Sequence, residues 1–85
     1  MCFVYIIQHT ETKQVYTGRT NNIKRRLEEH NQGKTSATQR KRGKWILIYS
    51  EIYRNEKDAI IREIRLKQHG RAEQELLKRI KFSLL

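Results

Sequence analysis

Residues 2–18 read CFVYIIQHTETKQVYTG and decide how the chain begins to fold. The run 2–7 is apolar at nearly every position, which is typical of a strand buried on both faces. A short polar stretch follows at 9–13, and β-forming residues resume at 14–18. Two β-rich runs around a short polar loop predict an antiparallel hairpin whose first strand lies inside a sheet.

The segment after the hairpin has the residues that begin and end a helix. Asn21 and Asn22 are common helix caps, and Gly33 is a residue type at which helices commonly end. These residues predict a helix over roughly 22–32. An apolar run led by a tryptophan then predicts a third strand over 45–51.

The last part of the chain is predicted to be helical. Asn55 with Asp58 resembles a capping box, and the helix that it opens should end at Gly70. Residues 71–81 carry apolar side chains at helical spacing and predict one more helix. The resulting order, β-β-α-β-α-α, predicts an α+β fold in which helices flank a small three-stranded antiparallel sheet.

Length and charge set the broad class of the protein. With 85 residues, no proline and no repeat, the chain should form a single domain over 1–85. Nineteen Lys and Arg residues against nine Asp and Glu residues give a formal net charge of +10. An excess of this size points to a polyanionic partner, with a nucleic acid ahead of an anionic membrane surface.

Cysteine usage and hydropathy indicate the compartment. Cys2 is the single cysteine, so no internal disulfide can form, which fits a reducing environment. The longest apolar run, 45–49, is far shorter than the roughly 20 residues of a membrane span, and no basic leader opens the chain. We therefore predict a cytoplasmic monomer without a membrane partner, compatible with association with the nucleoid.

One carboxylate lies on an apolar helix face. At about 100° per residue, the helix after Asn55 has one broad apolar arc. Its members are Ala59, Ile60, Ile61, Ile64 and Leu66. Glu63 falls inside this arc, where a carboxylate must be paired, hydrogen-bonded or bound to metal. The simpler interpretation is a salt bridge to Lys67, four residues later.

Four further polar groups should point toward the same sheet. Arg26 and His30 are four residues apart in the first helix and therefore face one way, although both could be basic residues at the margin of a core. Tyr5 and Tyr16 would be brought together by the hairpin, although most strand tyrosines only pack. Together with Glu63, these groups could attack a phosphodiester, because a carboxylate can hold a divalent metal and cations can neutralise a phosphate.

The order of these residues resembles the GIY-YIG nuclease family. Val4-Tyr5-Ile6 and the later Tyr16-Thr17-Gly18 are similar to its paired signature, with Val in place of the first Gly. The segment 18–33, which carries Arg26 and His30, is similar to its helix motif. The segment 59–67 is similar to its metal-binding motif. The resemblance covers residues 2–67 and is greatest to short, stand-alone members.

The resemblance implies a metal-dependent endonuclease that hydrolyses phosphodiester bonds of DNA. Glu63 would bind one divalent ion, Mg²⁺ or Mn²⁺, and Arg26 would stabilise charge on the phosphoryl oxygens. Tyr16 would position or deprotonate the attacking water, and Tyr5 would orient the water or the phosphate. His30 would assist proton transfer or hold Tyr5. A phenol has a pKa of about 10, so a base at this position needs cations nearby. The candidate cations are Arg19, Arg26 and His30.

A basic loop at 34–44 is predicted to lie beside this site and to bind backbone phosphates without reading sequence. The predicted nucleic-acid-binding residues are Arg19, Lys34, Arg40, Lys41, Arg42 and Lys44. The alternative interpretation of the loop is a solvated surface segment.

Two other functions remain open from the sequence. The domain could bind nucleic acid without cutting it, or it could be a scaffold, for which residues 82–85 are the candidate docking tail. His9 and His69 lack metal-ligand spacing and are predicted to be surface residues.

Overall fold

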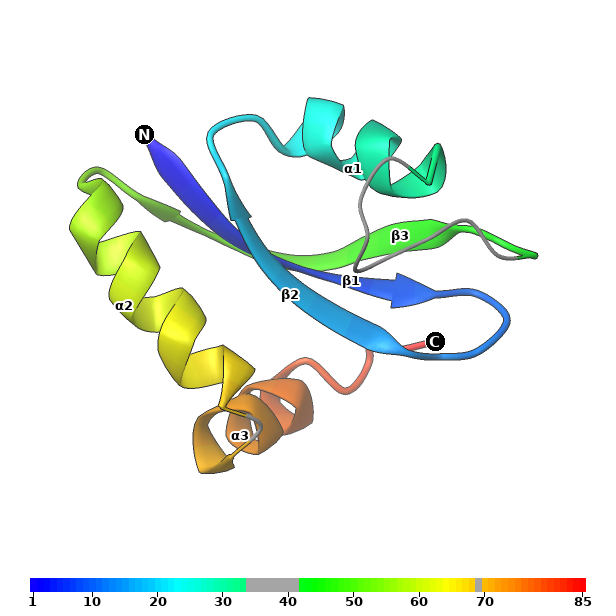
Figure 1. Cartoon of the computed structure of the whole chain (residues 1–85). Coiled ribbons are helices and arrows are strands. Elements are labelled where there is room, and N and C mark those ends of the chain that lie inside the picture. The colour runs from blue at the N-terminus through cyan, green and yellow to red at the C-terminus, as the bar shows by residue number, and fades with distance from the viewer. Residues whose placement is uncertain (34–41, 69) are drawn as a thin grey trace.

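The computed structural model describes residues 1–33, 42–68 and 70–85, and it has the predicted order of elements (Figure 1). The elements are β1 (Cys2–His9), β2 (Val15–Thr20), α1 (Ile23–Asn31), β3 (Trp45–Tyr53), α2 (Glu56–Lys67) and α3 (Arg71–Arg79). The predicted α+β fold with a three-stranded antiparallel sheet is therefore confirmed.

The sheet has the strand order β2-β1-β3, with β1 paired antiparallel to both neighbours. Helix α1 lies on one side of the sheet, and α2 and α3 lie on the other (Figure 1). Val4 and Ile6 face the core under α2 and α3, whereas Tyr5 and Ile7 face the core under α1. All four are 2% exposed or less, so the apolar run in β1 reflects burial on both faces.

Helix α2 buries a narrower stripe than its sequence predicts. Ala59 and Leu66 are fully buried, but Ile61 and Ile64 are 52% and 53% exposed. They lie outside the stripe because a three-stranded sheet covers only part of the helix circumference, and the flanks are taken by Arg62 and other paired polar residues. No helix in the described part of the chain is long and apolar enough to cross a membrane.

A polar network fixes α2 against β3. The carboxylate of Glu51 accepts hydrogen bonds from the hydroxyls of Tyr49 and Tyr53, at 2.6 and 2.5 Å, and from Nε and Nη2 of Arg62 at 3.0 Å each. Burial alone would raise the pKa of Glu51, but these four donors outweigh it and leave the pKa below its usual value. Because Arg62 is the neighbour of Glu63, the network also sets where α2 presents that carboxylate.

His9 is buried at the β1–β2 turn, so its predicted surface position is wrong. Its side chain is 1% exposed, and Nδ1 accepts hydrogen bonds from the backbone N–H groups of Glu11 and Thr12, both at 3.2 Å. The ring also packs edge-on against Trp45, with the centroids 5.2 Å apart. The imidazole accepts hydrogen bonds from N–H groups that find no backbone acceptor in a tight turn. The spacing of histidines along the sequence does not reveal this role. His69 lies outside the described residues.

The C-terminal segment returns to the sheet. The backbone N–H of Leu85 donates to Oε1 of the buried Gln8 at 2.8 Å. Phe82 is 93% exposed and contacts the ammonium group of Lys81, 5.1 Å from its ring centroid. The end of this segment is thus attached to β1, while one aromatic side chain remains in solvent.

Candidate active site

Tyr5 is placed by its pairing with Gly18. The two residues are direct partners across β1 and β2, and the tyrosine ring lies over the glycine. A Cβ atom added to Gly18 would come within 2.5 Å of Tyr5 Cζ, closer than atoms can approach. Gly18 therefore makes room for the ring, and the tyrosine is 2% exposed as a result.

Gly18→Ala should displace Tyr5 and lower the free energy of unfolding by about 1–3 kcal/mol, the usual cost of overpacking. Urea unfolding measures the loss. Gly70→Ala is the matched control, because among the described residues, its chain neighbours aside, no atom lies within 4 Å of its added Cβ. It should cost less than about 1 kcal/mol through its helix-capping position. Equal losses in the two variants would show that the ring moves without cost.

His30 holds Tyr5 from the other side. It lies in the last turn of α1, is fully buried, and shares a hydrogen bond of 2.7 Å between Nε2 and the Tyr5 hydroxyl. Its ring also meets the ring of Tyr16 edge-on, with the centroids 5.2 Å apart. This geometry agrees with the holding role, one of the two that the sequence left open for His30.

Both partners of this hydrogen bond are neutral near pH 7. Burial, assisted by the positive charge of Arg26, lowers the pKa of His30 to about 4. Burial also raises the pKa of Tyr5 to about 12, although a hydrogen bond from Arg26 opposes the rise. A neutral imidazole carries no positive charge, so His30 is removed from the candidate cations.

The pKa of His30 makes stability depend on pH. Between its folded value of about 4 and its ordinary value of 6.5, the unfolded chain binds a proton that the folded chain does not. The free energy of unfolding should therefore rise with pH across this window. Lowering the pH from 7 to 5 should reduce it by about 2 kcal/mol. Urea unfolding followed by Trp45 fluorescence measures the profile. His30→Gln should flatten it, and an unchanged slope would mean that His30 is charged in the folded protein.

Tyr16 lies between the two helices that carry the remaining site residues. Its ring contacts His30 of α1 on one side, and the ammonium group of Lys67 in α2 lies 5.4 Å from its centroid. The residue is half-buried, and its hydroxyl has no hydrogen-bond partner within residues 1–33, 42–68 and 70–85. Arg26 is 35% exposed in its side chain and donates from Nη1 to Glu29 at 3.1 Å. Within the described residues, Tyr16 thus offers an unpaired hydroxyl on a ring that the ammonium group of Lys67 approaches.

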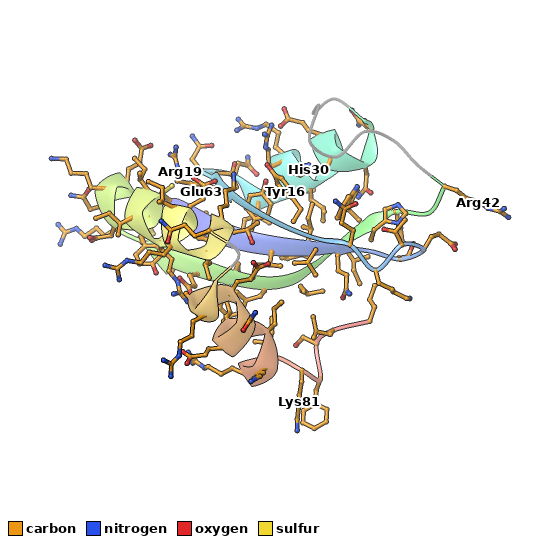
Figure 2. The ribbon with its side chains drawn as sticks, turned by 60° about the horizontal axis from the view of Figure 1, so that its bottom comes forward. Tyr16, Arg19, His30, Arg42, Glu63 and Lys81 are labelled. Carbon is orange, nitrogen blue, oxygen red and sulfur yellow. The ribbon has the colours of Figure 1, made fainter. Side chains whose placement is uncertain are left out.

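Glu63 reaches the same place from the opposite layer, at the edge formed by β2 (Figure 2). Its side chain is 16% exposed, and both oxygens are paired: Oε1 with Arg19 Nε at 3.3 Å and Oε2 with Lys67 Nζ at 3.2 Å. The salt bridge to Lys67 is the simpler interpretation of the sequence, and it is present. The partner in β2, Arg19, is 44 positions away in sequence and also pairs with Glu56 at 3.5 Å.

The residues around Glu63 allow a divalent ion only in a site that the substrate completes. No group of three His, Cys, Asp or Glu residues in the described part of the chain could hold a metal. Mg²⁺, however, is often held by one or two carboxylates together with substrate phosphates and water. Arg19 and Lys67 are 32% and 44% exposed in their side chains, so they can turn from the carboxylate to an incoming phosphate. Glu63 fits a site of this kind.

The basic loop is not beside this site where the structure describes it. Lys44 is bound to the hairpin turn, because Thr10 N donates to its carbonyl at 2.9 Å and Thr10 Oγ1 accepts from its N–H at 3.0 Å. Arg42 points away from the other labelled site residues in Figure 2. The cause is the register: Trp45 pairs with His9, so the residues before β3 meet the turn. Lys34, Arg40 and Lys41 lie outside the described residues.

Comparisons with known proteins agree with this geometry. The GIY-YIG catalytic domain, a nuclease domain, matches residues 1–78. A UPF0213 protein of Oceanobacillus iheyensis is 38% identical over 94% of this chain and 90% of its own. A UPF0213 protein of Halobacterium salinarum is 36% identical over 91% and 99%.

A solved structure is also similar to this chain. The solution NMR structure of a UPF0213 protein from Bacillus halodurans has a TM-score of 0.56 and 29% identity, and the match covers 95% of this chain and 86% of that one. The family signature corresponds to the physical core of the site, since the second tripeptide contains both Tyr16 and the glycine that accommodates Tyr5. The chain belongs to the GIY-YIG catalytic-domain family.

Proposed function

We propose that the protein is a metal-dependent endonuclease that hydrolyses phosphodiester bonds of DNA. The observation that carries the proposal is the position of Tyr16. Its hydroxyl, which has no hydrogen-bond partner among the described residues, lies in a site that also holds the carboxylate of Glu63 and the guanidinium of Arg26, at an open edge of the sheet. A strongly basic chain supplies the electrostatic attraction for the polyanion.

Each residue of the site has a separate task in this proposal. Tyr16 positions the attacking water or accepts its proton, and the ammonium group of Lys67 lies 5.4 Å from its ring centroid. Arg26 neutralises the phosphoryl oxygens, for which the planar guanidinium is suited. The hydrogen bond between the neutral side chains of Tyr5 and His30 keeps Tyr5 and α1 in place, and it transfers no proton.

Glu63 would hold the divalent ion, Mg²⁺ or Mn²⁺. When bound, the ion supplies Lewis-acid stabilisation of charge at the scissile phosphate and the leaving oxygen. Arg19 and Lys67 release the carboxylate as they turn to phosphates of the substrate. The ion pairs thus hold the Glu63 carboxylate in place before substrate arrives.

A nucleic-acid-binding domain without catalysis is the second candidate. It is favoured by the ion pairs at both oxygens of Glu63, which satisfy this carboxylate without any metal. The same basic surface serves both candidates, so binding alone cannot separate them. We further propose that the protein acts as a cytoplasmic monomer.

Cleavage assays on supercoiled plasmid, flaps and branched DNA test the function. We expect cleavage that requires Mg²⁺ or Mn²⁺ and stops when a chelator is added. Tyr16→Phe protein purified in parallel controls for contaminating nucleases. Binding of all these substrates without cleavage of any, in either metal, would favour the second candidate.

A further inference from the structure

A basic hollow lies next to the candidate active site, where β2 leads into α1. It has a volume of about 280 Å³ and opens to solvent. Three arginines line it, Arg19, Arg25 and Arg26, together with the residues that connect the two elements. Arg19 and Arg26 already have roles in the proposed function, whereas Arg25 has none.

The charges around the hollow do not cancel. Its lining has three guanidinium groups and one carboxylate, that of Glu56. Arg25 donates from Nη2 to the neutral Oδ1 of Asn21 at 3.1 Å, and within the described residues no carboxylate forms an ion pair with it. Arg19 and Arg26 are paired with the carboxylates of Glu63 and Glu29. The uncompensated charge at the hollow is therefore that of Arg25, and an anion that enters the hollow would neutralise it.

The start of α1 adds to the positive potential. Its first turn contains no acidic residue, whereas the first turn of α2 has Glu56 and Asp58. The side chain of Asn22 accepts from the N–H of Arg25 at 3.1 Å, and the preceding N–H groups of the turn have no acceptor within the helix. Such groups attract anions.

We propose that this hollow binds a phosphate group, namely the backbone phosphate of the nucleic acid that neighbours the one to be cut. The hollow is slightly smaller than the roughly 300–1,000 Å³ of most small-molecule pockets, which suits a single phosphate with its water. Arg26 is shared between the hollow and the site, so the two phosphates would lie on one strand. This inference rests on the proposed function, because the neighbouring phosphate is defined by its position next to the phosphate that is cut.

Metal-free binding of duplex DNA tests the hollow with Arg25→Gln. A lost phosphate contact should reduce the slope of log affinity against log salt by about 0.9. Arg71→Gln removes the same charge from α3, where the side chain is 90% exposed and paired with Glu75, and it is the matched control. A slope reduced in the first variant and unchanged in the second supports the site. Equal slopes in the two variants overturn it.

Nuclear magnetic resonance distinguishes the two sources of phosphate. Inorganic phosphate, added at constant ionic strength against chloride, should shift the amides of residues 20–22 in the wild type and not in Arg25→Gln. Duplex DNA should shift the same amides and displace the phosphate. Phosphate that DNA does not displace would assign the hollow to a free phosphate ligand and overturn the backbone assignment. Absence of shifts with both would overturn the site.

The two proposals can fail separately. The slopes and the amide shifts are measured without metal and without cleavage, so an inactive protein with the expected Arg25→Gln slope would keep the phosphate site and lose the endonuclease. A protein that cleaves DNA while Arg25→Gln and Arg71→Gln have equal slopes would keep the endonuclease and lose the site.

Discussion

Replacement of Tyr16 by phenylalanine is expected to slow DNA cleavage by roughly 10²–10⁴-fold, the usual loss when a positioned acid or base is removed. The substitution keeps the ring, and with it the contacts to His30 and Lys67. Because the hydroxyl has no hydrogen-bond partner in the described part of the protein, its removal should change stability little. The rate is measured at saturating DNA and metal, where a change in binding cannot contribute.

Tyr5→Phe is the control, and it should affect stability more than the cleavage rate. Its hydroxyl is buried against Nε2 of His30, so its loss should cost about 1–3 kcal/mol of stability, which urea unfolding measures. Its cleavage rate should fall less than that of Tyr16→Phe. A Tyr16→Phe protein that cuts at the wild-type rate would disprove the mechanism and leave the fold untouched.

Glu63→Gln should abolish metal-dependent cleavage, with a rate loss of at least about 10²-fold, because a bound ion contributes several kcal/mol to phosphoryl-group chemistry. The variant should still fold. Its two lost ion pairs involve partly exposed partners and are worth about 0–1 kcal/mol each. Metal-free DNA affinity should be unchanged or slightly higher, since Arg19 and Lys67 lose their competing carboxylate.

Glu75→Gln is the matched control for Glu63→Gln, because Glu75 also pairs with an arginine on a helix, far from the site. It should cut DNA at the wild-type rate. If Glu63→Gln loses stability but its folded fraction still cuts, Glu63 is a structural ion-pair residue and the proposed metal ligand is wrong.

Local pattern was enough to predict the order of the elements and most of their positions. The apolar run of β1 and the cap residue Asn22 act over a few neighbouring positions, and both predictions agree with the structure. The strand ends were less predictable. Strand β2 continues to Thr20 and β3 to Tyr53 because these residues pair with the beginning of β1, which depends on register and not on composition.

The chemistry of the site depended on contacts between distant residues. The spacing of Arg26 and His30 correctly placed them on one helix face, but burial makes His30 neutral, and no local feature of the sequence indicates that burial. Likewise, the anomaly of Glu63 was visible in the helix pattern, whereas its ion pair with Arg19 joins two elements 44 residues apart. The resemblance to a known family identified the set of residues, and the structure supplied their charge states and partners.

Insertions and deletions in the β1–β2 hairpin have very different consequences at the turn and within β2. Residues 11–14 are exposed at the tip, where added chain need not alter strand pairing. One residue added between Tyr16 and Gly18 would instead turn the tyrosine toward the α2 layer, because alternate strand residues face opposite sides of the sheet. The glycine must stay opposite Tyr5, so the fold requires the two-residue step from Tyr16 to Gly18. The number of residues at the exposed tip of the hairpin is under no such constraint.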